Sequence, residues 1–291
     1  ASLLCNGCSY TEMHCGNGRA CMIYQFDKTT PIHLLQITDC HVHNERERLL
    51  SGVNTYNSLT QVIDGVLARE QSADLALITG DLTHEGDERA YHLLQQQLNR
   101  LPVPFFWLPG NHDHLAPMAS TASSEHQQAK QLLLQHWQIL LLDTHVENEV
   151  GGAVSQSELT WLATALREHP DKHVAIFMHH PLLPVGCAWL DPQRIANAEQ
   201  VLTLFDNTPQ LRAVCNGHVH QENDVQRLHY RLLSTPSTCI QFKRNSADYA
   251  EDDFPPGYRR FVLHADGHFE TEVVRVGELV RDANAPRGYD E

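Results

Sequence analysis

The chain has 291 residues, which is enough for one large α/β domain or two small ones around a buried core. Hydrophobic residues make up 42% and charged residues 20%, which is typical of a folded globular protein and not of a disordered one. The formal net charge of −15 opposes binding to a nucleic-acid backbone, and no apolar run reaches the roughly 18 residues of a membrane span. The first residues lack the basic start and apolar stretch of a signal peptide. We therefore expect a cytoplasmic protein without a nucleic-acid or membrane partner.

The eight cysteines fall into two groups. Four are scattered through the chain and are most simply buried thiols in a cytosolic protein, namely Cys40, Cys187, Cys215 and Cys239. The others lie close together in a C-x2-C-x6-C-x5-C pattern, formed by Cys5, Cys8, Cys15 and Cys21. This spacing could close a zinc site of four thiolates. The alternative is an accessory extension without metal, because the segment is rich in Gly and Asn and has no apolar periodicity.

The next part of the chain alternates between strand and helix. Apolar runs predict buried strands at 33–37, 75–78, 105–108, 139–142, 174–178 and 211–215. Helices are predicted between them at 59–67, 90–98, 131–136, 156–166 and 198–205. A capping box from Ser155 to Glu158 opens the fourth helix, and Asn197 can cap the fifth.

After residue 218 the helical pattern stops. Short strand-like runs follow at 231–234, 239–243, 259–264 and 269–275. Alternating strands and helices followed by antiparallel-type strands favour a mixed α/β domain. We divide the chain into a Cys-rich extension at 1–28, one domain at 29–277 and a C-terminal tail at 278–291.

Polar residues stand directly after five of the predicted strands, at Asp39, Asp81, Asn111, His179 and His218. In open α/β sheets, ligands bind at the carboxyl ends of the strands. Histidine is also unusually frequent, with 20 residues against 21 Lys and Arg, which favours metal ligands in an acidic chain. One residue separates Asp39 from His41, so in extended backbone both side chains point to the same side. His218 and His220 share this spacing. Cys40, which stands between Asp39 and His41, is predicted to point away from them as a packed thiol.

These motifs resemble those of the calcineurin-like metallophosphoesterases. The sequence contains Asp39-x-His41, Gly80-Asp81, Gly110-Asn111-His112-Asp113, His179-His180-Pro181 and Gly217-His218-Val219-His220 in the order of that superfamily. A closer resemblance, over about residues 32–276, is to the bacterial class III 3′,5′-cyclic AMP phosphodiesterases of the CpdA type, through GCAWLD at 186–191 and TPSTCIQF at 235–242. It implies a four-layer α/β/β/α sandwich with two mixed sheets. Two features depart from the pattern: Cys40 fills a position that is commonly Thr, and the Cys-rich segment has no counterpart.

The resemblance also implies a centre of two divalent metal ions, Fe and/or Mn, with Zn as a further option. One ion would be held by Asp39, His41, Asp81 and His220, and the other by Asp81, Asn111, His179 and His218. Asp81 would bridge the two, and mixed nitrogen and oxygen ligands suit these metals. Two such ions can clamp the attacking and leaving oxygens of an in-line displacement. The implied reaction is attack of a metal-bridging hydroxide on 3′,5′-cAMP, which yields 5′-AMP and lowers intracellular cAMP.

Other residues near these motifs have implied roles in catalysis or substrate binding. His112 is the candidate general acid for the leaving oxygen, or an electrostatic brace for the phosphate, and Asp113 could orient it. The candidate substrate-binding residues are His41, Asn111, His112, His180 and His220. For His180 the alternative is packing behind His179.

Further residues carry both a local and a functional interpretation. Three histidines near the motifs are predicted to be solvated loop residues, namely His43, His84 and His114. Trp189 could stack on a purine or serve as a core or lid residue. The acidic stretch at 248–253 is predicted to be a solvated loop that could border the site.

Two other functions remain open alongside the cyclic-nucleotide phosphodiesterase. One is a related hydrolase of another phosphodiester, a phosphomonoester or a nucleoside-diphosphate substrate, because specificity depends on the loops at 83–87, 115–129 and 186–197. The other is a non-catalytic scaffold, which the intact ligand set and His112 disfavour. The protein is expected to be a monomer or a homodimer.

Overall fold

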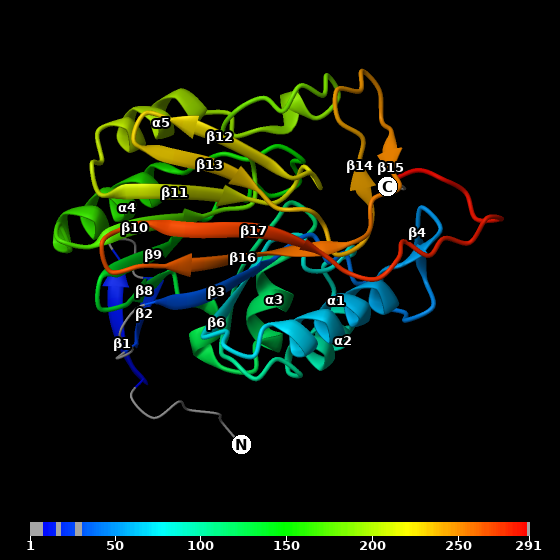
Figure 1. The fold of residues 1–291 in the computed structure, drawn as a ribbon, viewed down its shortest axis with the longest axis horizontal. Coiled ribbons are helices and arrows are strands. Elements are labelled where there is room, and N and C mark those ends of the chain that lie inside the picture. The colour runs from blue at the N-terminus through cyan, green and yellow to red at the C-terminus, as the bar shows by residue number, and fades with distance from the viewer. Residues whose placement is uncertain (1–7, 16–18, 27–30, 290–291) are drawn as a thin grey trace.

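Two β-sheets pack face to face in the computed structural model, which describes residues 8–15, 19–26 and 31–289 (Figure 1). The first sheet has five strands in the order β17-β16-β3-β6-β7. Its strands are β3 (Ile32–Ile37), β6 (Leu75–Thr79), β7 (Phe105–Leu108), β16 (Gly257–Leu263) and β17 (Phe269–Arg275). β3, β6 and β7 are parallel, whereas β16 runs antiparallel to both β3 and β17.

The second sheet has eight strands in the order β1-β2-β8-β9-β10-β11-β13-β12. Its strands are β1 (Cys8–Cys15), β2 (Arg19–Phe26), β8 (Gln131–Leu133), β9 (Trp137–Leu141), β10 (His173–Phe177), β11 (Leu211–Asn216), β12 (Asn223–Arg227) and β13 (Tyr230–Ser234). β9, β10, β11 and β13 are parallel neighbours. The outer pairs β1–β2, β8–β9 and β12–β13 are antiparallel.

Helices cover the outer face of each sheet. On the five-stranded sheet these are α1 (Thr55–Arg69), α2 (Glu88–Leu98) and α3 (Leu115–Thr121), and on the eight-stranded sheet they are α4 (Gln156–Glu168) and α5 (Ala198–Asp206). Leu34 of β3 belongs to the apolar cluster between the sheets, whereas its neighbour Leu35 packs toward the helices, as strand alternation requires. This arrangement confirms the α/β/β/α sandwich.

Smaller elements complete the fold. They are the strands β4 (Leu49–Leu50), β5 (Val53–Asn54), β14 (Gln241–Phe242) and β15 (Glu251–Asp252) and the short 3₁₀ helices η1 (Glu125–Gln128) and η2 (Asp191–Gln193). β4 pairs with β5 and β14 with β15, so each pair forms its own two-stranded sheet. The described helices all fall short of the length and hydrophobicity needed to cross a bilayer.

The predicted helix at 131–136 is wrong, because its first residues form strand β8. Leucine favours helices, and the triple-leucine run shows no period that separates helix from strand. β8 pairs with β9 on one side and with β2 on the other, and these tertiary partners decide its conformation.

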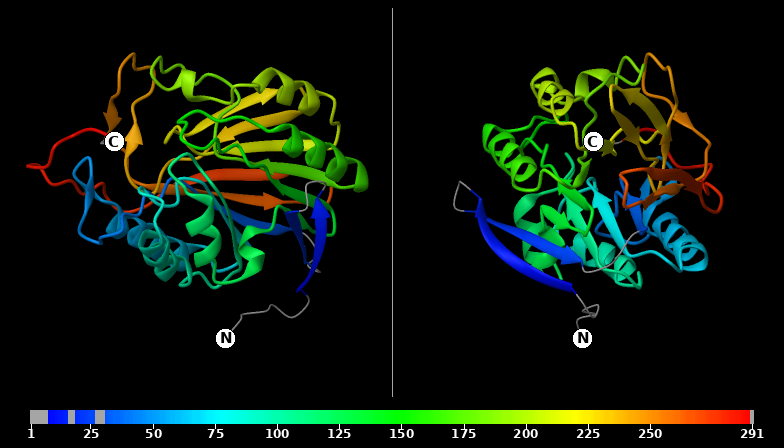
Figure 2. Two further views of the ribbon diagram at one scale, coloured as in Figure 1. Left: turned by 180° about the vertical axis from the view of Figure 1, so that it is seen from behind. Right: turned by 60° about the vertical axis from the view of Figure 1, so that its left-hand side comes forward.

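The N-terminal segment also differs from the sequence interpretation, which predicted no strand before residue 33. β1 and β2 form an antiparallel hairpin, and β2 adds to the edge of the eight-stranded sheet (Figure 2). Tyr24 of β2 is buried between the sheets against Phe106. For the possible thiolate site, Cys5 and the side chains of Cys8, Cys15 and Cys21 lie outside the described residues. The division of the chain after residues 28 and 277 stays a prediction.

The two predicted helix caps have different outcomes. Ser155 caps α4, since its hydroxyl accepts a hydrogen bond from the backbone of Glu158. Asn197 is the N-cap residue of α5, so its position is confirmed, but its side chain makes no cap hydrogen bond to the helix. Instead it bonds both the N–H and the carbonyl of Val154, and so ties the start of α5 to the loop before α4.

Candidate metal centre

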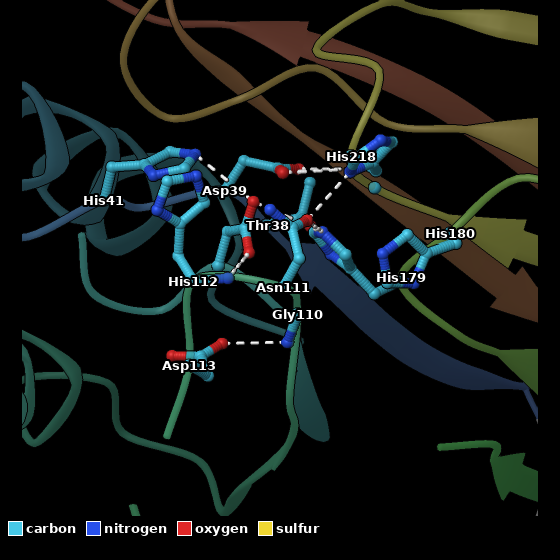
Figure 3. Close-up of polar contacts among 12 residues, drawn as sticks. Thr38, Asp39, His41, Gly110, Asn111, His112, Asp113, His179, His180 and His218 are labelled. Carbon is cyan, nitrogen blue, oxygen red and sulfur yellow. Dashed lines mark hydrogen bonds and ion pairs between the residues drawn. The ribbon is translucent and has the colours of Figure 1, made fainter. Parts of the chain in front are cut away.

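The predicted ligands lie together at the carboxyl ends of strands from both sheets (Figure 3). Asp39 and Asp81 follow β3 and β6 of the five-stranded sheet, and Asn111 follows β7. His179 and His218 follow β10 and β11 of the other sheet. Both sheets therefore contribute side chains to one rim.

The first ligand group contains Asp39, His41 and His220, which are all buried. The Nε2 atoms of His41 and His220 are 3.3 Å apart, and Asp39 Oδ1 lies 3.3 Å from His220 Nε2. Two imidazole nitrogens and a carboxylate oxygen thus converge on one point, which is the donor set that a divalent metal prefers.

The second ligand group is centred on Asn111. Its Oδ1 atom lies 3.2 Å from His179 Nε2 and 3.0 Å from His218 Nδ1. Both histidines are buried, whereas Asn111 is partly exposed. The structure therefore brings together the three residues expected at the second metal position in addition to Asp81.

Asp81 connects the two groups through a single oxygen. Its Oδ2 atom lies 3.6 Å from His41 Nε2 and 3.3 Å from His179 Nε2. Its other oxygen accepts a hydrogen bond from the backbone N–H of His112. One carboxylate oxygen facing both histidine groups is the geometry of a bridging ligand.

Contacts behind the ligands show that these residues fit a metal centre. His179 Nδ1 lies 2.9 Å from the carbonyl oxygen of Thr79, and His220 Nδ1 lies 2.9 Å from that of Ile240. A carbonyl can only accept, so both Nδ1 atoms carry hydrogen. In the neutral ring this leaves the Nε2 lone pair facing the cluster, which is the arrangement of a metal-binding histidine.

The electrostatics of the centre favour positive charge beside Asp81. Burial alone opposes ionisation of Asp81 and His179, but their mutual attraction outweighs it. The pKa of Asp81 therefore lies well below its usual value, and the pKa of His179 is raised to about 9. Burial lowers the pKa values of His41 and His218 well below the usual value, so both are neutral and can donate a lone pair.

The backbone at the ligands is strained. Nine described residues other than glycine have a positive φ, and five of them are candidate ligands, namely Asp39, His41, Asp81, His218 and His220. Such a left-handed conformation costs about 1–3 kcal/mol per residue and gathers at functional sites. The extended backbone predicted for the two i, i+2 pairs is therefore wrong. Their side chains do converge, but through left-handed turns.

Neighbouring loops hold this strained backbone in place. The N–H of Asp39 donates to the carbonyl of Gly80 over 3.0 Å, and the N–H of His41 donates to that of Asp81 over 2.9 Å. Gly80 has a φ of +90°, and a Cβ atom there would lie 2.3 Å from His179 Nδ1. The loop after β6 thus needs glycine both for its conformation and for the close approach of a ligand.

His112 lies beside the first ligand group, with its ring centroid 4.9 Å from that of His41. Its Nδ1 atom lies 3.1 Å from the carbonyl oxygen of His84, to which it donates. The imidazole rings of His84 and His112 also stack, with centroids 4.8 Å apart. His84 therefore orients His112. It lies in a loop, as the sequence predicted, but is only partly exposed.

The expected contact between Asp113 and the His112 ring is not among the interactions of the described residues. Asp113 is fully buried, and its carboxylate accepts hydrogen bonds from Gly110 N, Leu82 N and the hydroxyl of Tyr91. Burial, with repulsion from Asp81 in addition, raises the pKa of Asp113 to about 6. Asp113 thus supports the loops that carry Asp81 and Asn111 from beneath.

His180 has both ring nitrogens engaged with the protein. Nδ1 lies 2.8 Å from the Thr144 hydroxyl and Nε2 lies 3.1 Å from the Val150 carbonyl. The side chain is buried, and burial lowers its pKa to about 3, so it is neutral. These contacts favour the packing alternative over direct contact with a phosphate.

The remaining candidates divide between the core and the surface. His43 is buried and contacts Glu85, whereas His114 is exposed as predicted. Cys40 is a buried free thiol. Trp189 packs edge-on against Phe242, with ring centroids 4.9 Å apart, which favours its core role.

The acidic stretch at 248–253 is not a solvated loop throughout. It contains strand β15, and Glu251 has a side chain only 4% exposed that pairs with Arg281. Tyr289, which the sequence interpretation assigned to a tail, hydrogen-bonds to His41 at 2.6 Å. No motif signals this residue, because it follows the last predicted strand in a segment without periodicity.

A cavity of about 710 Å³ opens on the His180 side of the centre. Its lining includes Glu149, Gly151, Gly152, Asp191 and Arg194. Gly152 lies against His180, since a Cβ atom at this glycine would be 2.5 Å from the imidazole ring. His180 thus lies between the cavity wall at Gly152 and the rings of His179 and His218, against which it packs.

Residues 32–222 match the calcineurin-like phosphoesterase family. The chain belongs to this family. It is 37% identical over 261 residues to an Escherichia coli K12 protein named 3′,5′-cyclic adenosine monophosphate phosphodiesterase CpdA, covering 89% of this chain and 95% of that protein. It is 35% identical over 247 residues to a Nostoc protein named 3′,5′-cyclic-nucleotide phosphodiesterase, covering 84% of this chain and 93% of that one.

Solved structures agree with the family assignment at the level of the fold. A dimetal phosphatase from Danio rerio superimposes with a TM-score of 0.58 at 14% identity, covering 85% of this chain and 100% of that chain. A purple acid phosphatase from yellow lupin gives a TM-score of 0.58 at 12% identity, covering 92% of this chain and 59% of that chain. The sandwich is therefore the metallophosphoesterase fold.

Proposed function

We propose that this protein is a metal-dependent cyclic-nucleotide phosphodiesterase, which hydrolyses 3′,5′-cAMP to 5′-AMP and so lowers intracellular cAMP. The observation that carries the proposal is the single oxygen of Asp81 that faces both histidine groups. The relatives named CpdA, which are 34–37% identical over most of the chain, support the substrate.

The residues suit two divalent metal ions, for which we propose Fe and/or Mn, with Zn as a further option. Asp39, His41 and His220 would hold one ion, Asn111, His179 and His218 would hold the other, and Asp81 would contact both. When bound, such a pair supplies Lewis acidity and lowers the pKa of water. The chain itself is acidic, so the positive field for a phosphate comes from this centre.

His112 supplies the proton of the proposed reaction. Its Nδ1 atom donates to the carbonyl of His84, and this bond and the stacked His84 ring fix the ring plane. Nε2 is then the nitrogen that can face the substrate. We assign to it the transfer of a proton to the 3′ oxygen as this leaves phosphorus.

The other candidate substrate residues contribute unequally. Asn111 is partly exposed, and its amide NH₂ can donate to a phosphate oxygen while its Oδ1 faces the histidines. His41 and His220 each present Nε2 to the ligand cluster, so their part in substrate binding is indirect. His180 positions His179 and His218, against whose rings it packs.

The proposal extends to the surroundings of the enzyme. A cytoplasmic location follows from an intracellular messenger as substrate. The excess of 36 acidic over 21 basic residues disfavours a nucleic-acid partner. We propose a monomer or a homodimer, because all the candidate ligands come from one chain.

The test is hydrolysis of 3′,5′-cAMP by protein loaded with Mn or Fe, with 2′,3′-cAMP and bis-p-nitrophenyl phosphate assayed in parallel. Conversion of 3′,5′-cAMP to 5′-AMP in preference to the other substrates is expected. Cleavage of the aryl ester without cleavage of 3′,5′-cAMP would refute the substrate and favour another phosphoester. A protein that binds the metal ions but cleaves none of these esters would favour the scaffold alternative.

A further inference from the structure

Residues 277–289 form a strap that crosses the metal-centre end of the molecule beside β4 and the β14–β15 pair (Figures 1 and 2). Backbone contacts hold it there: Asp282 N donates to Gly52 O over 2.8 Å, and Arg281 forms an isolated bridge with Val53. The side chain of Arg281 donates to Ser51 O and pairs with Glu251, where both partners are at most 10% exposed. The strap is therefore anchored at its middle.

The end of this strap reaches into the metal centre. The Tyr289 hydroxyl lies 2.6 Å from His41 Nε2, which is the nitrogen that faces Asp81 and His220. The Tyr289 ring centroid is 5.5 Å from that of His112. Gly288 N also donates to the Ser51 hydroxyl, directly before the tyrosine. Tyr289 thus lies within the centre, beside both a ligand and the proposed proton donor.

Tyr289 belongs to a cluster of aromatic rings beside His220, called here the aromatic wall, which also contains Phe242 and Tyr249. Phe242 stacks on His220 with ring centroids 4.1 Å apart, and Tyr289 meets Phe242 at 5.5 Å and Tyr249 at 6.3 Å. Leu279 of the strap packs against the same apolar cluster. Tyr289 is the member of this wall that stands next to His112, so it borders the space that a leaving group must use.

The shape of the substrate decides what this ring does. In a cyclic diester both ester oxygens are attached to one ribose, so the two substituents project from phosphorus in the same direction. In an acyclic diester two separate groups diverge, and the group beside His112 meets Tyr289.

We propose that Tyr289 is a specificity-determining residue, whose ring narrows the space beside His112 and so favours compact cyclic diesters over bulky acyclic ones. This rests on the function proposed above. The ring, and not the hydroxyl, carries the discrimination, because exclusion depends on volume. The hydroxyl also lies 3.2 Å from His41 Nδ1, which carries hydrogen when Nε2 holds a metal ion and can then donate to it, and this contact holds the ring beside the centre.

The experiment compares Tyr289→Ala and Tyr289→Phe with the wild type, using 3′,5′-cAMP, bis-p-nitrophenyl phosphate and the smaller methyl p-nitrophenyl phosphate. Tyr289→Ala should raise kcat/KM for the bis-aryl ester relative to 3′,5′-cAMP by at least about tenfold, which is the scale of steric discrimination in a pocket. Tyr289→Phe should stay within about threefold of the wild type. Val280→Ala, at a strap residue that is 65% exposed, serves as the matched control and should change nothing.

A second readout separates specificity from metal loss. Calorimetric titration with Mn²⁺ should give two ions per chain for the wild type and both Tyr289 variants. Loss of an ion from Tyr289→Ala would overturn the proposal and make Tyr289 a support of the metal centre. An unchanged ester preference in Tyr289→Ala, or an equal shift in Tyr289→Phe, would also overturn it.

The two proposals fail in different ways. If the wild type cleaves aryl esters but not 3′,5′-cAMP, the function proposed above fails. The ratio of bis-aryl to methyl aryl ester cleavage then still tests Tyr289, because both esters are acyclic and differ in bulk. A rise in this ratio in Tyr289→Ala would support the role of the ring, and a constant ratio would refute it.

Discussion

A methyl group at Gly80 would collide with the metal centre from beneath. The Cβ atom of an alanine there would lie 2.3 Å from His179 Nδ1 and 2.9 Å from the Cα atom of Gly110. Neither neighbour can move away easily. His179 is buried and hydrogen-bonded to the Thr79 carbonyl, and the crowded atom of Gly110 belongs to the backbone. Gly80 also has a φ of +90°, which an alanine adopts only with strain.

The magnitude follows from these two contributions. A left-handed conformation costs a residue with a Cβ atom about 1–2 kcal/mol, and overpacking of a buried site costs about 1–3 kcal/mol. Replacing glycine by alanine also stabilises the folded state by about 0.4–1 kcal/mol, because alanine lowers the conformational entropy of the unfolded chain. We expect Gly80→Ala to lower the free energy of unfolding by about 1–4.5 kcal/mol.

Gly151 provides the matched control, because it lies on the same rim without crowding. The nearest atoms to a Cβ there are 3.5 Å away, which is ordinary contact. Gly151→Ala should therefore keep the free energy of unfolding within about 1 kcal/mol of the wild type. Urea titrations in the presence of a chelator measure all three proteins without the contribution of bound metal. Equal stability of Gly80→Ala and Gly151→Ala would refute the reasoning.

Three further predictions concern the centre and one distant ion pair. His112→Ala should lower kcat by about a hundred- to ten-thousand-fold with both metals retained, as atomic emission would show; metal loss would contradict its role as proton donor. Asp81→Ala should lose both metals while circular dichroism shows a folded chain, and an undiminished metal count would exclude the bridging role. Hydrogen bonds from Arg227 lower the pKa of Asp206 below 3.8, so the stabilisation is present above that pH and is lost as pH falls through the lower folded-state value. Asp206→Asn should then be less stable than the wild type by up to about 1 kcal/mol at neutral pH, and a gap in urea midpoints that persists at acid pH would be evidence against this.

Most of the strands could be predicted because their signal is local. An apolar run that ends in a polar residue or glycine marks a buried strand wherever it lies, as at β6 followed by Gly80 and Asp81. Strand β8 shows the limit of this signal. Its leucines suit a helix as well as a strand, and only β2 and β9 select the strand.

The candidate ligands could be brought together from the sequence, but their backbone conformation could not be predicted. The spacing of Asp39 and His41 predicts convergence, whereas their left-handed conformations are imposed by backbone bonds to the loop at Gly80 and Asp81. Such strain persists only where the surrounding structure holds it, so no local propensity could have signalled it.

The sequence by itself determined the alternation of strands and helices, the order of the metal motifs and hence the family, because periodicity and turn chemistry act between near neighbours. Only the tertiary structure decided which groups meet. Asp113 lies beneath the loops and not beside the His112 ring, His84 takes over the orientation of His112, and the strap carries Tyr289 back to His41 across 248 positions of sequence. Contacts between distant segments depend on how whole sheets and loops pack, and the local sequence holds no record of them.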